Sequence, residues 1–208
     1  MTIPLVLRSA RYLAAEAQAR ILSPGDTAVD CTLGNGHDAL SLAKLVGETG
    51  KLIGFDIQPE AVERTRQELA KEGLADRCEL HCMGHEHILE VVREKVKCIV
   101  FNLGWLPGGD KSITTHWETT QIAIRGALDL LLPMGILTVC VYPGHAAGEE
   151  ERVNLTTFFA SLRPQEYNVL HQRFINAGSG APECFIIQRQ SVHEESNSMA
   201  AQIKEASL

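Results

Sequence analysis

The sequence predicts an α/β fold with a seven-stranded, mostly parallel sheet, one antiparallel strand near its edge, and helices on both faces. Strand-like and helix-like segments alternate from Thr27 onward, which is the order of a parallel sheet with crossover helices. The early strands are apolar throughout, so helices should cover both of their faces. The last two strands are joined by a Gly/Pro loop, NAGSGAPE, that is too short for a crossover helix, so we expect them to pair antiparallel.

Local signals set the individual elements. Ser23-Pro24-Gly25-Asp26 stops an Ala-rich amphipathic helix, Pro59 opens another helix, and Thr115-x-x-Glu118 has the spacing of a capping box. Pro133-Met134-Gly135 should turn the chain between a helix and a strand. Strands are expected at residues 27–31, 51–56, 77–82, 97–102, 136–142, 167–175 and 184–190. Helices are expected at residues 8–22, 37–46, 60–73, 85–95, 115–132 and 148–162.

Length and composition indicate one globular domain. The 208 residues are 45% hydrophobic and 22% charged, which excludes a disordered chain, a collagen and a coiled coil. We expect a single domain at residues 1–190 and a polar tail at 191–208. No apolar run approaches the length of a membrane span, and the N-terminus lacks the pattern of a signal peptide.

The cysteines indicate the cellular compartment, and the charge balance limits how the protein could bind nucleic acid. Six scattered cysteines without a CxxC motif indicate reduced thiols of a cytoplasmic protein, and the cluster between Cys78 and His87 lacks the spacing of zinc ligands, so no metal is expected. With 19 Lys and Arg against 26 Asp and Glu, the net charge is −7, which excludes nucleic-acid binding through bulk charge. A local basic strip is still compatible with the sequence, and its candidate residues are Arg8, Arg11, Arg20, Lys111 and Arg125.

Four of the predicted strands are followed by loops with polar, glycine or aromatic residues that could bind a ligand. Ligands of open α/β sheets bind at these carboxyl ends of the strands. The first loop runs from Asp30 through Asp38. Its Gly34 and Gly36 permit a tight turn and close approach of a ligand to the backbone, and the next helix offers its N-terminal amides. Taken alone, Gly34-x-Gly36-x-x-Ala39 also fits a dinucleotide-binding pattern.

The second and third loops suit a nucleoside. Asp56 ends a strand 22 residues after Gly34, where its carboxylate can accept both hydroxyls of a ribose; a solvated strand-end Asp is the alternative. Gly84 or His85, after the next strand, could contact an adenine. His85 as an ordinary helix N-terminal residue is equally compatible with the sequence.

The fourth loop, Asn102-Leu103-Gly104-Trp105, brings together an amide side chain, a backbone carbonyl and an aromatic face. This combination can hold an NH group attached to a planar ring. The alternative is a Gly/Pro turn with Trp105 packed in the core, but a turn does not explain a polar Asn at the end of an apolar strand. A carboxylate such as Asp30 aimed at the ligand favours the cationic amino-acid end of S-adenosylmethionine over NAD.

These motifs also carry a resemblance to a family. The order D-x-T-x-G-N-G-x-D, F-D-I-Q and N-L-G-W-L-P-G-G-D-K-S-I-T-T, with Tyr142-Pro143-Gly144-His145 and Glu151, resembles the small class I methyltransferases of the rRNA methylase family over about residues 5–190. The resemblance implies a Rossmann-like class I methyltransferase fold and S-adenosylmethionine as cofactor. It also implies methylation of the aminomethyl group of a wobble uridine (5-aminomethyl-2-thiouridine), with a tRNA anticodon stem-loop as partner. Trp105 stands where the family more often has Tyr.

The resemblance and the loops together assign roles to individual residues. Asn102 and the carbonyl of Leu103 should orient the amine, and Trp105 should stack on the base. The expected cofactor-binding residues are Asp30, Gly34, Asn35, Gly36, His37, Asp38, Asp56, Gln58, Gly84 and His85. The expected substrate-binding residues are Lys111, Thr114, Thr115, His116, Tyr142 and His145.

Several alternatives remain open at this stage. The substrate could be rRNA, or a small-molecule amine or hydroxyl, which would suit the acidic surface. A non-catalytic cofactor-binding module is disfavoured by the intact glycine loop and Asn102, and a dehydrogenase ranks third. No dedicated base is evident, although His116 and His145 are candidates. The sequence is also compatible with a homodimer.

Overall fold

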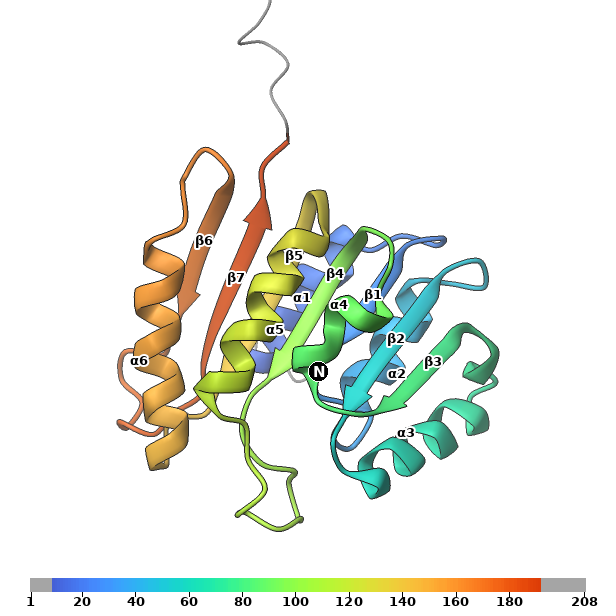
Figure 1. Ribbon diagram of the computed structural model, residues 1–208, viewed down its shortest axis with the longest axis horizontal. Helices are drawn as coiled ribbons and strands as arrows, with labels where there is room; N and C mark the ends of the chain where they lie inside the picture. The colour runs from blue at the N-terminus through green and yellow to red at the C-terminus, as the bar shows by residue number, and fades with distance from the viewer. Residues whose placement is uncertain (1–8, 192–208) are drawn as a thin grey trace, which may run out of the picture.

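A computed structural model of the chain describes residues 9–191 and shows within them a sheet of seven strands in the order β3-β2-β1-β4-β5-β7-β6 (Figure 1). The strands are β1 Thr27–Asp30, β2 Lys51–Asp56, β3 Cys78–Cys82, β4 Val96–Asn102, β5 Leu131–Val141, β6 Tyr167–Gln172 and β7 Glu183–Arg189. The helices are α1 Ala10–Ile21, α2 His37–Leu45, α3 Pro59–Lys71, α4 Ile88–Val91, α5 Trp117–Leu130 and α6 Ala146–Ala160.

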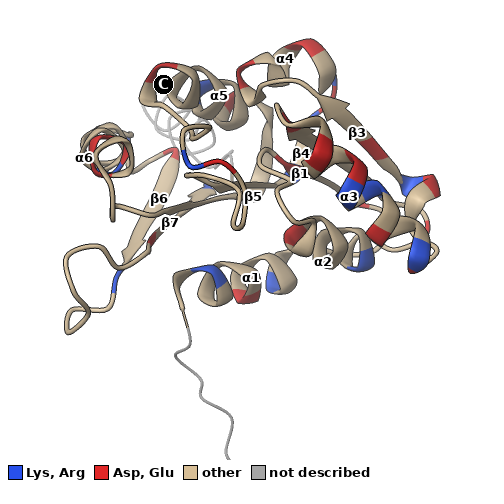
Figure 2. Ribbon diagram, turned by 90° about the horizontal axis from the view of Figure 1, so that it is seen from below, with Lys and Arg blue, Asp and Glu red and all other residues tan. Residues whose placement is uncertain are grey.

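Helices cover both faces of the sheet, as predicted, because successive residues of the apolar strands point to opposite sides. Ala28 of β1 packs in the cluster that contains Leu42 of α2 and Val62 of α3. Its neighbour Val29 packs in the cluster on the other face, with residues of α4, α5 and α6. Figure 2 shows α1 and α2 on one side of the sheet and α5 and α6 on the other.

The predicted strand directions are also confirmed. Strands β1 to β5 pair in parallel, whereas β7 pairs antiparallel with both β5 and β6. The chain runs from β1 outward to β3 and then returns to place β4 beside β1, with Asp30 opposite Val100. This reversal is the topological switch point of the sheet, and it sets the loop after β1 beside the loop after β4.

Two predicted elements differ clearly from the structure. The helix expected at 85–95 is a 3₁₀ turn at His85–His87 followed by the short α4, because Val92 is buried in an extended conformation that leads into β4. Strand β5 begins at Leu131, before the expected start at 136, and takes up Pro133-Met134-Gly135 as an irregularity in its pairing with β4.

The capping box is wrong as well, because His116 is the N-cap of α5 and the Thr115 hydroxyl bonds elsewhere. Of the tail predicted at 191–208, residues 192–208 lie outside the described residues, and so does Arg8. None of the helices within residues 9–191 has the length and apolar run that a membrane crossing needs.

Candidate active site

A cavity of about 570 Å³ lies at the carboxyl ends of β1, β2 and β4, within the size range of small-molecule sites. In Figure 1 this is the lower end of the sheet, where the loop between β4 and α5 projects. Most of the residues predicted from the sequence meet here. The lining includes Gly34, Asn35, His37, Asp38, Asp56, Gln58, Gly84, His85, Asn102, Leu103, Trp105, Thr114, Thr115, His116, Tyr142 and His145.

Asp56 is held in place by two backbone donors. Its Oδ2 accepts the N–H of Gly34 at 2.9 Å, and its Oδ1 accepts the N–H of Gln58 at 2.9 Å. Gly34 has a φ of +52°, a left-handed conformation that a residue without a Cβ adopts freely. Each carboxylate oxygen has two acceptor sites, so Asp56 retains capacity for hydroxyl donors from a ligand in the cavity.

Asp30 does not face the cavity, contrary to the prediction. Asp30 is the last residue of β1, and its side chain is fully buried, with Oδ1 accepting the N–H of Thr32. Within the described part of the chain Oδ2 has no hydrogen-bond partner. Burial, and then the nearby Asp38 carboxylate, raise the pKa of Asp30 to about 8. The acidic residue of this loop that lines the cavity is Asp38.

Gly36 and Lys111 also lie outside the cavity lining. Gly36, at a φ of +79°, is the N-cap of α2, and an added Cβ would stand 2.9 Å from Oγ1 of Thr65 in α3. Its glycine character therefore serves the close packing of α2 against α3. Lys111 is exposed on the loop after β4, with its Nζ 5.4 Å from the ring centroid of Trp105.

His85 presents a lone pair in a buried position. Its Nδ1 lies 3.2 Å from the carbonyl oxygen of Cys31, and a carbonyl only accepts, so Nδ1 carries the proton. Burial lowers the pKa of His85, which favours the neutral ring. Nε2 is then an acceptor, and among residues 9–191 it has no partner. This arrangement suits an amino group such as that of adenine.

Asn102 is oriented by two neighbours. Its Nδ2 donates to Oδ2 of Asp38 at 2.7 Å, and its backbone N–H donates to Oγ1 of Thr32 at 2.7 Å. A carboxylate cannot donate, so the amide oxygen must point the other way. That oxygen, Oδ1, is buried and finds no hydrogen-bond partner within the described residues. The site therefore contains a desolvated acceptor that a ligand N–H or O–H would satisfy.

The sequence reasoning missed the roles of Thr32 and Arg11 in this arrangement. Arg11 of α1 lines the cavity and lies 3.3 Å from Oδ1 of Asp38, so it fixes the carboxylate that holds Asn102. Thr32 stands within the D-x-T motif, as a hydroxyl directly after a buried strand. That polar residue was a usable signal, whereas the contact of Arg11 requires knowledge of how α1 packs.

Trp105 lies in the loop between β4 and α5 and lines the cavity. It forms a bridge with Thr114, and its ring centroid is 4.2 Å from that of His145. The ring is partly exposed, so the alternative of a Trp105 packed in the core is wrong. Trp105 and Asn102 thus line the same cavity.

The expected basic strip is only partly present. Arg11 lines the cavity, whereas Arg20 and Arg125 do not, and the Arg125 guanidinium lies 4.7 Å from the ring centroid of Phe158. Figure 2, which looks onto this end of the sheet, shows basic residues scattered among acidic ones. The cations placed beside cavity-lining residues include Arg11, next to Asp38, and Lys111, over Trp105.

Comparisons with known proteins place this geometry in a known class. A solved "putative rRNA-methylase" from Clostridium thermocellum is 37% identical, with a TM-score of 0.87 over 89% of this chain and 100% of that chain. A protein from Streptococcus mutans described as "a putative methyltransferase", solved in complex with S-adenosylhomocysteine, is 28% identical, with a TM-score of 0.80 over 88% of this chain and 98% of that one. The fold is the Rossmann-like class I methyltransferase fold.

The family itself is identified by its sequence model. The model described as "Putative rRNA methylase" matches residues 52–188, and the chain belongs to this family. It is a methyltransferase whose methyl donor is S-adenosylmethionine. The chloroplastic tRNA (mnm(5)s(2)U34)-methyltransferase of Arabidopsis thaliana is 33% identical over 182 residues. That alignment covers 83% of this chain and 66% of the Arabidopsis protein, which is therefore the longer of the two.

Proposed function

We propose that this chain methylates the aminomethyl group of a tRNA wobble uridine, converting 5-aminomethyl-2-thiouridine to 5-methylaminomethyl-2-thiouridine. The observation that carries the proposal is the buried, unpartnered Oδ1 of Asn102, in a cavity that also contains an indole face. An amine attached to a planar base matches both features. The name of the Arabidopsis relative supports the choice of base.

The cavity residues fit S-adenosylmethionine. Asp56 would accept the ribose hydroxyls, and Nε2 of His85 would accept from the adenine amino group. When bound, this cofactor supplies a methyl group already activated on a sulfonium. The protein then mainly has to position the nucleophile.

Asn102 and Leu103 would perform that positioning. Oδ1 of Asn102 and the carbonyl of Leu103 would accept the two amine hydrogens, which would leave the nitrogen lone pair free to point at the methyl group. Transfer would break the methyl–sulfur bond and release S-adenosylhomocysteine, and the methylated nitrogen would lose one proton to water. Trp105 stacks on the pyrimidine, as aromatic side chains do on splayed RNA bases. Asp38 is a positioning residue, because its carboxylate sets which way the Asn102 amide faces.

His145 does not serve as the base in this scheme. Its Nδ1 accepts the N–H of Gly148 at 3.2 Å, and desolvation lowers its pKa, so the neutral ring carries its proton on Nε2. Neither nitrogen then has a free lone pair for the amine proton. We propose that His145 acts instead through its ring, which packs against Trp105.

The partner in this proposal is a tRNA anticodon stem-loop, bound by a domain of residues 1–190 in the cytoplasm. An anticodon loop presents one unstacked base over a small footprint, which suits a net charge of −7. A reducing compartment is consistent with the cysteines, since all six lie within residues 9–191 and are free thiols.

The direct test is a methylation assay. Purified protein and S-adenosylmethionine are incubated with tRNA that carries 5-aminomethyl-2-thiouridine, and the nucleosides are measured by mass spectrometry. We expect 5-methylaminomethyl-2-thiouridine, and no product on the same tRNA without the aminomethyl group. Methylation of rRNA or of a small amine, with this tRNA untouched, would overturn the proposal.

Asn102→Ala tests the chemical role within the same assay. We expect turnover to fall by about 100-fold, the scale of losing a preorganised polar contact to the reacting group. Affinity for S-adenosylhomocysteine should stay within about twofold, because the lost contact is to the acceptor amine. Turnover that stays within a factor of about three of the parent would remove the orienting role of Asn102.

A further inference from the structure

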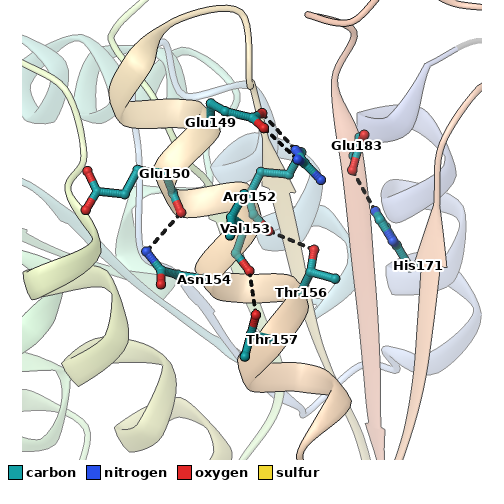
Figure 3. A network of polar contacts seen from close by, with 9 residues as sticks. All are labelled: Glu149, Glu150, Arg152, Val153, Asn154, Thr156, Thr157, His171 and Glu183. Atoms are coloured by element: carbon teal, nitrogen blue, oxygen red, sulfur yellow. Dashed lines mark hydrogen bonds and ion pairs between the residues drawn. The ribbon is translucent and has the colours of Figure 1, made fainter.

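A fully buried glutamate, Glu151, lies behind the loop between β4 and α5. Helix α6 carries Glu149, Glu150 and Glu151 in succession. Figure 3 shows Glu149 paired with Arg152 and the Glu150 side chain directed away from the helix. Glu151, on the other side of α6, is fully buried.

The partners of Glu151 come from two different segments. Its Oε1 accepts the hydroxyl of Thr120 in α5 at 2.6 Å, and its Oε2 accepts the hydroxyl of Thr115 in the loop before α5 at 2.7 Å. Burial raises the pKa of Glu151, which records the cost of removing a carboxylate from water. Hydrogen bonds from two neutral hydroxyls offset only part of this desolvation free energy, so packing alone does not explain a glutamate at this position.

Thr115 also contacts the loop that directly follows Asn102. Its Oγ1 accepts the N–H of Gly104 at 2.8 Å, and its own N–H donates to the carbonyl of Gly104 at 3.2 Å. A hydroxyl has one proton, and here that proton goes to Glu151, which leaves the oxygen lone pairs for Gly104. Gly104 has a φ of +130° and directly follows Leu103. The orientation of this peptide therefore depends on the Thr115 hydroxyl.

We propose that Glu151 is a positioning residue for methyl transfer, which acts through Thr115 to hold the Leu103–Gly104 peptide in its reactive orientation. This role rests on the proposed function of the loop as the amine-binding element. Glu151 contacts neither cofactor nor substrate in this scheme. It restrains the loop from behind, where α5 and α6 meet it.

A matched pair of threonine variants separates this role from simple stability. Thr115→Val and Thr120→Val each remove one hydroxyl from Glu151 with little change in volume. Only Thr115→Val also removes the hydroxyl oxygen that accepts the N–H of Gly104, while the bond from the Thr115 N–H to the Gly104 carbonyl stays. We expect Thr115→Val to lower kcat at least tenfold with affinity for S-adenosylhomocysteine unchanged. Thr120→Val should lower the melting temperature but keep kcat within about twofold of the parent.

Variants of Glu151 itself complete the test. Glu151→Ala should lower kcat as Thr115→Val does, and combining the two should cost no more than Thr115→Val alone, since they break one chain of contacts. Glu151→Gln should restore most of kcat, because its amide oxygen can still accept from Thr115. Its NH₂ can then face Thr120, whose hydroxyl can turn to a carbonyl of its own helix. Glu150→Gln makes the same chemical change on the exposed side of α6 and should leave kcat unchanged.

Hydrogen exchange measured by mass spectrometry on residues 103–116 provides a readout that needs no substrate. We expect faster exchange in Thr115→Val and Glu151→Ala, and parent-like exchange in Thr120→Val. This result stands even if the tRNA assay fails, so the two proposals can fail separately. Equal kcat losses in the two threonine variants, or parent-like kcat in Thr115→Val, would overturn the role of Glu151.

Discussion

Asp56 and Asp30 end neighbouring parallel strands, yet their surroundings give them different chemistry. Asp56 lines the cavity and accepts two backbone N–H groups. Asp30 is fully buried, and its Oδ1 accepts one backbone N–H. The same side chain is therefore a cavity-lining acceptor at one strand end and a buried, proton-binding group at the other.

Replacing Asp56 should weaken cofactor binding. Asp56→Ala removes the acceptor that we propose for the ribose hydroxyls, and it leaves the N–H groups of Gly34 and Gln58 without their partner. We expect affinity for S-adenosylhomocysteine to fall by about 30-fold or more, equivalent to about 2 kcal/mol, measured by isothermal titration calorimetry. The melting temperature should be checked first, so that affinity is measured on folded protein. Unchanged affinity would contradict the assignment.

Asp30 should make stability depend on pH. Its pKa is raised from 3.8 to about 8 by burial, so the folded state holds a proton that the unfolded state releases between these values. The stability that Asp30 contributes is full below pH 3.8 and is lost as the pH rises through about 8. Asp30→Asn removes this titration. Its melting temperature should change less between pH 5 and pH 8 than that of the parent, and a parallel pair of curves would refute the prediction.

At the scale of elements, the junction of α2 with α3 determines how the glycine loop is presented. Gly36 caps α2 in a left-handed conformation and packs directly on Thr65 of α3. Gly73 has a similar φ of +68° after α3, but an added Cβ there would meet nothing within 4 Å. The two glycines therefore share a backbone requirement and differ in steric surroundings.

Alanine substitutions should separate these two effects. Gly73→Ala should lower the free energy of unfolding only through its backbone conformation, by about 1 kcal/mol. Gly36→Ala should lower it by the same amount and by about 1–3 kcal/mol more, because the added Cβ is forced against Thr65. Urea denaturation of both variants measures the difference, and equal losses would show that packing on Thr65 is unimportant. Gly36→Ala should also weaken binding of S-adenosylhomocysteine, because the adjacent loop shifts.

At the scale of the whole molecule, the acidic net charge limits how the proposed RNA substrate could be bound. The net charge is −7, and the cations that lie beside cavity-lining residues include Arg11, next to Asp38, and Lys111, over Trp105. Under the proposed function, RNA binding would rely on a small number of phosphate contacts and on the base held in the cavity. Lys111, which reaches over Trp105, is the exposed cation best placed to meet a phosphate beside that base.

Salt dependence tests this view. Affinity for the anticodon stem-loop should fall as salt rises, and Lys111→Ala should reduce the slope of log K against log salt by about 1. Arg125→Ala is the matched control, since Arg125 lies over Phe158 and outside the cavity lining. The opposite result, in which Arg125→Ala reduces this slope and Lys111→Ala does not, would contradict the prediction and would indicate that RNA contacts α5 instead.

The fold and most of the cavity followed from the sequence because they depend on local, repeated signals. Apolar strands alternating with helices require a covered parallel sheet, and the short loop before β7 requires a reversed strand. Polar residues at the ends of such strands must meet at one edge. The loops after β1, β2, β3 and β4 could therefore be assigned to one site from their positions alone.

Only the tertiary structure decided how polar side chains pair within that site. Asp30 and Asp38 are both acids of one loop, but Asp38 accepts from the Asn102 amide, whereas Asp30 is fully buried. Thr115 had the spacing of a capping box, but its hydroxyl oxygen accepts the N–H of Gly104, and its proton goes to the buried carboxylate of Glu151, 36 residues further along the chain. Sequence patterns determine which residues reach the same edge of the sheet, because strand and helix periods are local. Which donor meets which acceptor depends on the positions of the individual polar atoms, and the packing of the helices and loops determines these positions.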